Sequence, residues 1–347
     1  MKILRLDSLV FPVSAYERKS WKLLGFSQFD EINGDTQEEI IAHGRDADVV
    51  VVISNYLPAR VIDGFRNCRL IMRRGTGCDK IDIDRATEKG ILVANLPAFA
   101  TEDVADNAIM LMLAVARNLN TLINAVSDRD WVERKKKSRQ TSTRVSGKTM
   151  GIIGFGNIGK EVAKRGKGFG MRVIDYHRHV KPEEEAALGV EPVSLDTLIR
   201  ESDFIILTCP KTKETLHMID EAQFRIMKPT AYLINVSRGD VTDEHAFAKA
   251  LRTGQIAGGA TDVFQHLNMF ETAQGQPACL YEGLDNFVCT PHCAADTLES
   301  QQESIDKAAE QIGLVLNGYF PSSWKNPELA QRLGGQYKFL SESQFAE

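Results

Sequence analysis

The chain has 347 residues, a length that corresponds to about two domains. Hydrophobic residues make up 43% and charged residues 26%, as in an ordinary globular protein, and the net charge of −5 gives no reason to expect nucleic acid as a partner. No apolar run approaches the roughly 20 residues that span a bilayer, so no membrane partner is expected, and the first residues lack the pattern of a signal peptide. The six cysteines have no C-x-x-C spacing, which indicates reduced thiols in a cytoplasmic protein without a disulfide framework or a metal site.

Residues 1–100 carry alternating strand and helix patterns, which predict a parallel, doubly wound sheet. The expected strands are Lys2–Leu6, Val49–Ile53, Arg69–Arg73 and Leu92–Ala94, and the expected helices include Thr36–His43 and Pro58–Phe65. The third strand leads into Gly75-Thr76-Gly77, a tight turn whose backbone N–H groups are suited to hold an anion.

A long apolar helix and a charged segment follow. The helix is expected to begin at Glu102 and to end near Arg117, and it is apolar nearly all round. This pattern predicts burial between domains or at a subunit interface. The run from Glu133 to Arg139 is strongly charged, and we expect it to form a solvated loop.

The segment from Lys148 to Arg178 predicts a strand, a glycine turn, a helix and a second strand. Its turn reads Gly154-Phe155-Gly156-Asn157-Ile158-Gly159, the G-x-G-x-x-G pattern that binds a dinucleotide when it joins a strand to a helix. Gly154 permits the tight turn, Gly156 lets the backbone approach a pyrophosphate, and Gly159 lets helix and strand pack closely. The N-terminus of the helix offers N–H groups and a positive dipole end to the phosphates.

Four further strands are expected after the glycine segment. They are Phe204–Thr208, Ala231–Val236, Ala257–Asp262 and Phe287–Thr290. In open parallel sheets ligands bind beyond the carboxyl ends of the strands, so the residues at those ends are candidates for the site. These candidates are Cys209, Arg238, Asp262 and His292. A helix is expected from Thr297 to about Leu316, and residues 322–347 are expected to form a loosely docked tail.

Together the patterns predict an α/β protein with two doubly wound, Rossmann-like parallel-sheet domains, in which the cofactor domain is inserted in the substrate domain. We assign residues 1–100 and 297–347 to the substrate (catalytic) domain and residues 101–296 to the dinucleotide-binding domain. The active site is then expected in the cleft between the two domains.

The chain resembles the D-2-hydroxyacid dehydrogenase family over roughly residues 45 to 325, and six segments carry the resemblance. They are GTGCDKIDIDRATEKGILVANLP (75–97), the VAD…R helix (104–117), GKTMGIIGFGNIG (147–159), LTCPKTKETLHMI (207–219), INVSRGDVTDE (234–244) and VCTPHCA (288–294). The resemblance implies hydride transfer between a nicotinamide ring and the C2 carbon of a 2-oxo or 2-hydroxy acid. It also implies a homodimer built on the cofactor domain.

The resemblance further implies roles for single residues. Arg238 would pair with the substrate carboxylate and polarise the carbonyl, because a guanidinium offers a planar fork of donors that lysine lacks. His292 would act as the acid–base, a task suited to an imidazole, whose ordinary pKa lies near ~6.5. The N–H groups around Thr76, Gly77 and Cys78 would hold the substrate carboxylate, with Ser54, Asn55, Tyr56 and Arg73 near the substrate side chain. Cys209 and Pro210 would lie near the nicotinamide, and Asp262 would meet its carboxamide or orient nearby groups.

One departure from the family concerns the partner of His292. The family places a glutamate five residues after the strand-end aspartate, and Leu267 stands at that position here. Without a carboxylate partner, the histidine loses its orientation and an upward pull on its pKa. The segment also looks longer than usual, so we hypothesise that Glu271 replaces the missing group. Gln265 is a further candidate, because related enzymes that oxidise formate use a glutamine.

A second departure concerns the ribose of the cofactor. NAD-specific members carry an aspartate about 18 residues after the last glycine, and His177 stands there, followed by Arg178, His179 and Lys181. Cations at this place suit the 2′-phosphate of NADP(H), which we therefore favour. Asp175 lies two residues earlier on the same strand face and keeps NAD(H) as the alternative.

These observations favour a cytoplasmic, NADP(H)-preferring 2-oxoacid reductase with a small substrate such as glyoxylate or hydroxypyruvate. Ile53 stands where phosphoglycerate-type members place an arginine, which disfavours a phosphorylated substrate. The alternative is a dinucleotide-sensing scaffold similar to the C-terminal binding proteins, which the missing glutamate would fit but the intact Arg238 and His292 would not. Formate oxidation, a third possibility, would need a glutamine near His292.

Overall fold

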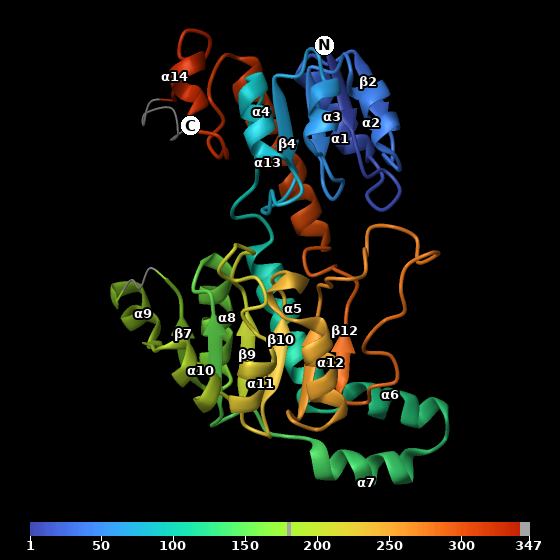
Figure 1. Ribbon diagram of the computed structural model, residues 1–347, viewed down its shortest axis with the longest axis vertical. Helices are drawn as coiled ribbons and strands as arrows, with labels where there is room; N and C mark the ends of the chain where they lie inside the picture. Colours follow the sequence, from blue (N-terminus) through green and yellow to red (C-terminus); the bar gives the residue numbers. More distant parts are fainter. Residues whose placement is uncertain (179–181, 341–347) are drawn as a thin grey trace. The chain divides into compact units, whose positions relative to one another are not determined.

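The computed structural model describes residues 1–178 and 182–340, which form two compact units (Figure 1). Unit 1 comprises Met1–Phe99 and Thr297–Glu347, and unit 2 comprises Ala100–Asp296. Unit 2 is therefore an insertion in the chain of unit 1. In the described part of the chain, no helix is both long and apolar enough to cross a membrane.

Unit 1 is built on a five-stranded parallel sheet with strand order β2-β1-β3-β4-β5. Its strands are β1 (Lys2–Arg5), β2 (Gln28–Glu31), β3 (Val49–Val52), β4 (Leu70–Arg73) and β5 (Leu92–Ala94). Its helices are α1 (Ala15–Leu23), α2 (Gln37–Gly44), α3 (Ala59–Gly64), α4 (Ile83–Lys89), α13 (Leu298–Leu316) and α14 (Leu329–Leu333). The order is that of a flavodoxin-like doubly wound sheet, and the four valines of β3 are buried because helices cover both faces.

The C-terminal segment of unit 1 is docked, so the expected loose tail is wrong over residues 322–340. The side chain of Asn326 is fully buried, donates to the carbonyl oxygen of Ile91 at 2.9 Å and accepts from the N–H of Val93 at 3.1 Å. Leu329 and Leu333 of α14 are buried in the same core. The amide of Asn326 thus pairs with backbone groups beside the edge strand β5, and this tertiary contact has no local sequence signal. Residues 341–347 lie outside the described residues.

Unit 2 is built on a seven-stranded parallel sheet with strand order β12-β11-β10-β9-β6-β7-β8. Its strands are β6 (Thr149–Ile153), β7 (Arg172–Tyr176), β8 (Glu191–Pro192), β9 (Phe204–Leu207), β10 (Tyr232–Asn235), β11 (Gly258–Thr261) and β12 (Phe287–Cys289). Its helices are α5 (Thr101–Ala116), α6 (Leu119–Ser127), α7 (Trp131–Thr141), α8 (Asn157–Gly168), α9 (Pro182–Leu188), α10 (Leu195–Glu201), α11 (Glu221–Ile226), α12 (Glu244–Arg252) and the 3₁₀ turn η1 (Gly239–Val241). Strand order reverses between β6 and β9, which is the Rossmann arrangement and places the ligand crevice at this switch point.

Two helices of unit 2 bear on the expectations from sequence. The apolar helix α5 packs against α8 and against β10, β11 and β12.

The charged run Glu133–Arg139 lies within α7, so the expected loop is wrong. Glutamate, arginine and lysine favour helices, and Lys136 pairs with Glu133 one turn earlier at 2.6 Å. Figure 1 shows α6 and α7 as a pair of neighbouring helices.

Candidate active site

In the glycine turn after β6, neighbouring protein atoms leave no room for a side chain at Gly154 and Gly159 but leave room at Gly156. A Cβ on Gly154, whose φ is +102°, would lie 2.6 Å from the backbone nitrogen of Cys209. A Cβ on Gly159 would lie 2.2 Å from the carbonyl oxygen of Gly154. At Gly156 a Cβ would meet no atom within 4 Å, and Asn157 and Ile158 begin α8 directly after it. The turn therefore fits a dinucleotide, with room for a pyrophosphate at Gly156 and at the helix N-terminus.

Cys209 and Pro210 follow β9, the neighbour of β6 at the switch point. Thr208 donates from Oγ1 to the carbonyl oxygen of Gly154 at 2.5 Å and ties the two strand ends together. Burial raises the pKa of the Cys209 thiol to about 11, so this cysteine is a neutral thiol at neutral pH. Thr215 donates to the carbonyl oxygen of Pro210 at 2.8 Å. The structure thus brings Cys209 against the glycine turn.

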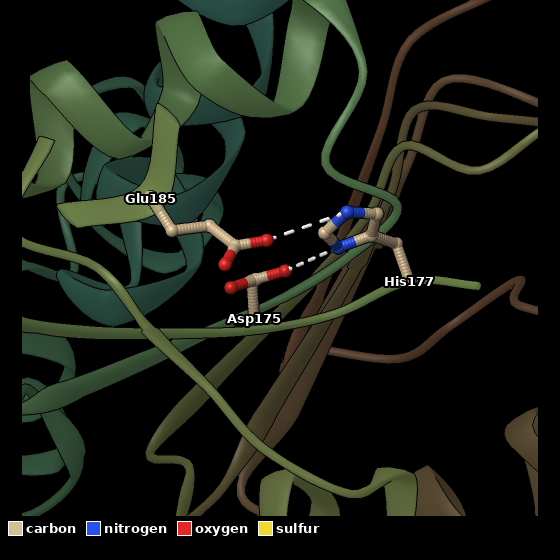
Figure 2. Close-up of side chains that lie close together, drawn as sticks. All are labelled: Asp175, His177 and Glu185. Carbon is tan, nitrogen blue, oxygen red and sulfur yellow. Dashed lines mark hydrogen bonds and ion pairs between the residues drawn. The ribbon is translucent and has the colours of Figure 1, made fainter. Parts of the chain in front are cut away.

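His177, directly after β7, contacts two buried carboxylates that lie on the same side of its ring (Figure 2). Its Nδ1 lies 2.7 Å from Oδ2 of Asp175, and its Nε2 lies 3.4 Å from Oε1 of Glu185. Asp175 and Glu185 are 0% and 1% exposed. Burial raises the pKa of Asp175, and the negative charge of Glu185 adds to the rise. Asp175 is hydrogen-bonded to one ring nitrogen and Glu185 forms an ion pair with the other, an arrangement that we call the clamp.

Arg178, the next cation, pairs with the loop after β9. One of its guanidinium nitrogens lies 2.6 Å from a carboxylate oxygen of Glu214, and both side chains are exposed. The hydrogen bond from Arg178 lowers the pKa of Glu214 to about 2. Arg178 is therefore at the surface beside the strand end, where a phosphate could compete with Glu214. His179 and Lys181 lie outside the described residues.

Arg238 stands on a turn after β10 that Asn235 shapes. The Asn235 amide donates to the carbonyl oxygen of Arg238 at 2.9 Å, and its Oδ1 accepts from the N–H of Ser237 at 3.0 Å. The next residue, Gly239, has no room for a side chain, since a Cβ would lie 2.1 Å from the carbonyl carbon of Phe264. The guanidinium is thus presented from a turn that is fixed on both sides.

His292 lies on a loop that Asp262 holds by three hydrogen bonds. The Asp262 carboxylate accepts from Thr290 Oγ1 at 2.5 Å, from the N–H of Cys293 at 3.0 Å and from the N–H of Ala294 at 3.1 Å. Burial raises the pKa of Asp262, although these hydrogen bonds oppose the rise. His292 itself has a φ of +55°, a conformation that non-glycine residues adopt only when their surroundings fix it. Asp262 therefore holds the loop that carries His292, and its role in the site stays a prediction.

An aromatic ring contacts the imidazole of His292. The ring of Phe270 lies 4.8 Å from that of His292 between centroids, with the planes tilted by 54°. Phe270 belongs to the long segment between β11 and β12, which the sequence marks only as longer than usual. No local pattern distinguishes it from other apolar residues of that segment.

The two residues weighed as partners of His292, Glu271 and Gln265, lie in the same segment as Leu267. The carboxylate of Glu271 accepts a hydrogen bond of 2.6 Å from the amide of Asn268. The amide of Gln265 lies 3.0 Å from Nε2 of His217. Leu267 lies between them in the chain. Glu271 thus follows directly on the ring that packs against His292, and its role stays a prediction.

Glu244, which the sequence does not single out, anchors the start of this segment. It is 3% exposed and accepts from the backbone N–H groups of Gln265 at 2.7 Å and His266 at 3.3 Å. Burial raises its pKa. This carboxylate holds the segment at the place where its backbone approaches Gly239, beside Arg238.

In unit 1 the predicted substrate residue Asn55 belongs to a polar network around Asp7. Asp7 is buried, has a φ of +64° and accepts from the N–H of Ile53 at 2.7 Å. The Asn55 amide donates to the Asp7 carboxylate at 3.0 Å and to the carbonyl oxygen of Asn33 at 2.6 Å. The network fixes the loop that follows β3.

The turn with Thr76, Gly77 and Cys78 follows β4 and is also braced. Thr76 donates from Oγ1 to the carbonyl oxygen of Leu96 at 3.0 Å, and Arg73 donates from Nε to that of Gly77 at 2.8 Å. The carbonyl oxygen of Cys78 accepts a backbone hydrogen bond of 3.0 Å. The carbonyl groups of the turn are thus used internally, which leaves its shape defined before any ligand binds.

Comparison with protein families identifies a match over residues 109–294 to the family described as D-isomer specific 2-hydroxyacid dehydrogenase, NAD binding domain. A glyoxylate reductase of Thermococcus onnurineus is 37% identical over 303 residues, which are 85% of this chain and 87% of that protein.

Solved structures give the same result for the fold. The D-lactate dehydrogenase of Aquifex aeolicus, solved with NAD and lactic acid, has a TM-score of 0.78 at 27% identity and covers 91% of this chain and 96% of its own. An acyclic imino acid reductase solved with NADPH and D-Arg has a TM-score of 0.78 at 25% identity, covering 94% of this chain and 100% of its own. One of these two structures thus contains NAD and the other contains NADPH.

Proposed function

The chain belongs to the D-isomer specific 2-hydroxyacid dehydrogenases, and from this premise we propose that it reduces a small 2-oxo acid with NADPH. As a family member it is a nicotinamide-dependent oxidoreductase of 2-oxo and 2-hydroxy acids. The dinucleotide-sensing scaffold without dehydrogenase activity is not favoured, because the similar proteins are named enzymes. Glyoxylate is the proposed substrate, supported by the glyoxylate reductase relatives and by the absence of an arginine at Ile53.

The bound nicotinamide supplies the hydride for C2, and the chain's own residues bind the substrate and deliver the proton. Arg238 is proposed to pair with the substrate carboxylate through its planar fork, which also draws electron density from the carbonyl. His292 is proposed to donate a proton to the carbonyl oxygen as C2 accepts the hydride. Glu271 is proposed to act with His292, and the N–H groups around Thr76, Gly77 and Cys78 to bind the substrate carboxylate.

The choice of NADPH is supported by the position of Asp175. A carboxylate that binds the ribose hydroxyls of NAD must be accessible, whereas the Asp175 side chain is buried and paired with His177. Arg178 stands at the surface beside it and suits a 2′-phosphate.

Steady-state oxidation of NADPH and NADH with glyoxylate, hydroxypyruvate, pyruvate and a bulky branched 2-oxo acid tests the proposal. We expect kcat/KM with NADPH and glyoxylate to exceed that with NADH by about tenfold or more, and His292→Ala to lose turnover. Faster turnover with NADH would overturn the cofactor preference. Turnover with neither cofactor would overturn the reductase assignment.

We also propose a cytoplasmic homodimer that forms through α6 and α7. Five apolar side chains on these helices are between 43% and 72% exposed: Leu119, Ile123, Val126, Trp131 and Val132. The first three share one helix face, and exposed apolar surface of this kind marks an interface. Light scattering of Val126→Asp against the wild type tests this, and a wild-type mass of 38.6 kDa would contradict it.

A further inference from the structure

The clamp around His177 contains two buried acceptors that contact the ring. Asp175 and Glu185 are buried, whereas the side chain of His177 is 15% exposed and is the outermost member of the three. The second carboxylate oxygen of Asp175, Oδ1, is buried and has no hydrogen-bond partner among the described residues. Figure 2 shows the two carboxylates facing each other, with the imidazole along one side of the pair. The cluster thus holds, next to a histidine ring, a buried carboxylate oxygen of Asp175 that accepts no hydrogen bond from the described residues.

The place of the cluster in the fold connects it with the dinucleotide. It lies at the end of β7, the strand next to β6, and the N–H of Gly154 donates to the carbonyl oxygen of Tyr176 at 2.9 Å. The ring of His177 lies 5.8 Å from that of Phe155, which is part of the glycine turn. In Rossmann folds this strand end meets the ribose that carries the 2′-hydroxyl or 2′-phosphate.

We propose that Asp175 and Glu185 form a masked binding site for the ribose hydroxyls of NAD(H), and that His177 is the residue that keeps it closed. The inference rests on the proposed preference for NADPH and gives it a physical cause. His177 then acts as a specificity residue by covering two anions, a role separate from any direct contact with the 2′-phosphate.

The mask acts on both cofactors, in opposite directions. A ribose hydroxyl gains a strong hydrogen bond only from an exposed carboxylate, so the covered pair offers NADH little. A 2′-phosphate is repelled by exposed carboxylates, so the same cover shields NADPH from two negative charges. Removing the ring should therefore strengthen NADH binding and weaken NADPH binding.

Dissociation constants of the two cofactors, measured by fluorescence titration without substrate, test the mask. In His177→Ala we expect NADH to bind about tenfold more tightly than in the wild type, and NADPH to bind more weakly. The added substitution Asp175→Asn should remove most of the gain in NADH affinity. Arg178→Ala is the matched control, because it removes the neighbouring cation and leaves the carboxylates covered, so NADPH should weaken while NADH stays unchanged.

A second variant covers the case in which His177→Ala does not fold, since the two carboxylates repel each other once the ring is gone. The amide of His177→Asn can keep the hydrogen bond to Asp175 while the part of the ring that faces Glu185 is lost, so a smaller gain in NADH affinity is expected. Unchanged or weaker NADH binding in a folded variant would overturn the proposal that His177 covers the two carboxylates. A wild type that prefers NADH would overturn the proposed cofactor preference instead, and the effect of His177→Ala on NADH would still decide the role of the ring.

Discussion

Phe270 packs its ring against the imidazole of His292, with the ring centroids 4.8 Å apart. Leu267 stands at the sequence position where the family has a glutamate, and Phe270, three residues later, restrains the imidazole through this aromatic contact. An aromatic pair of this kind is worth about 0.5–1.5 kcal/mol.

Phe270→Ala should therefore lower kcat/KM by about two- to tenfold, because the imidazole loses part of its orientation. The effect should appear in kcat, with dinucleotide affinity unchanged, and Phe270→Tyr should restore most of the rate. Phe169, an exposed phenylalanine at the end of α8, gives the matched control Phe169→Ala. Equal kcat in Phe270→Ala and the wild type would rule out this role.

Asp262 should prove important for both stability and turnover. The N–H groups of Cys293 and Ala294 donate to different oxygens of the Asp262 carboxylate. An asparagine has one acceptor oxygen, so its NH2 group would face one of these two N–H donors and leave that donor without its acceptor. Asp262→Asn should lower the free energy of unfolding by about 1–3 kcal/mol and reduce kcat by displacing His292. Urea unfolding and steady-state kinetics measure the two effects. Thr290→Val removes a single donor and should give a smaller loss, and a wild-type kcat in Asp262→Asn would refute the orienting role.

Much of unit 2 could be predicted from local sequence, because its features are short-range. The glycine turn is an example: the strand before it and the helix after it carry clear periodicities, and the structure puts Gly154 and Gly159 in contacts that exclude a side chain. The positions of Arg238 and His292 could be predicted for the same reason, since each follows a strand of the parallel sheet at its carboxyl end, and their roles stay predictions.

The residues that support these side chains could not be found in this way. Glu185, Glu244 and Phe270 act through contacts with residues 8 to 22 positions away in the chain. Glu185 and Phe270 stand in no recognisable motif, and Glu244 ends a family segment that gives no sign of what its side chain contacts. Asn326 contacts Ile91 across more than two hundred residues, so the tail looked loosely docked from sequence. Such long-range contacts depend on the completed fold, which local patterns do not contain.

Glu244 should make stability fall as pH rises above the ordinary carboxyl range. Its raised pKa means that the folded protein binds more protons than the unfolded chain between ~4.3 and the raised value. The free energy of unfolding therefore decreases with pH in that window and levels off above it, and the raised pKa values of Asp175 and Asp262 act in the same direction. Urea unfolding between about pH 4 and 7 should give a less negative slope for Glu244→Gln than for the wild type.

A control of opposite sign is available for this pH dependence. The hydrogen bond from Lys249 lowers the pKa of Glu221, so that carboxylate contributes stability above its ordinary pKa that is lost as the pH falls. Glu221→Gln should flatten the acid side of the stability profile and leave the slope above the ordinary carboxyl range unchanged. If the free energy of unfolding changes with pH in the same way in Glu244→Gln and in the wild type, Glu244 does not cause the loss of stability above the ordinary carboxyl range.

Gly156 and Gly159 should separate cofactor binding from folding. A methyl group on Gly156 meets no protein atom within 4 Å. The free energy of unfolding of Gly156→Ala should therefore differ from that of the wild type by no more than about 0.5 kcal/mol. The same methyl group fills the space for the pyrophosphate, and dinucleotide affinity should fall by about tenfold or more.

A methyl group on Gly159 lies 2.2 Å from the carbonyl oxygen of Gly154, so Gly159→Ala should be destabilised by about 1–3 kcal/mol although alanine favours helices. Thermal unfolding and fluorescence titration give the two readouts. Wild-type affinity in Gly156→Ala would mean that the dinucleotide does not approach the backbone at Gly156.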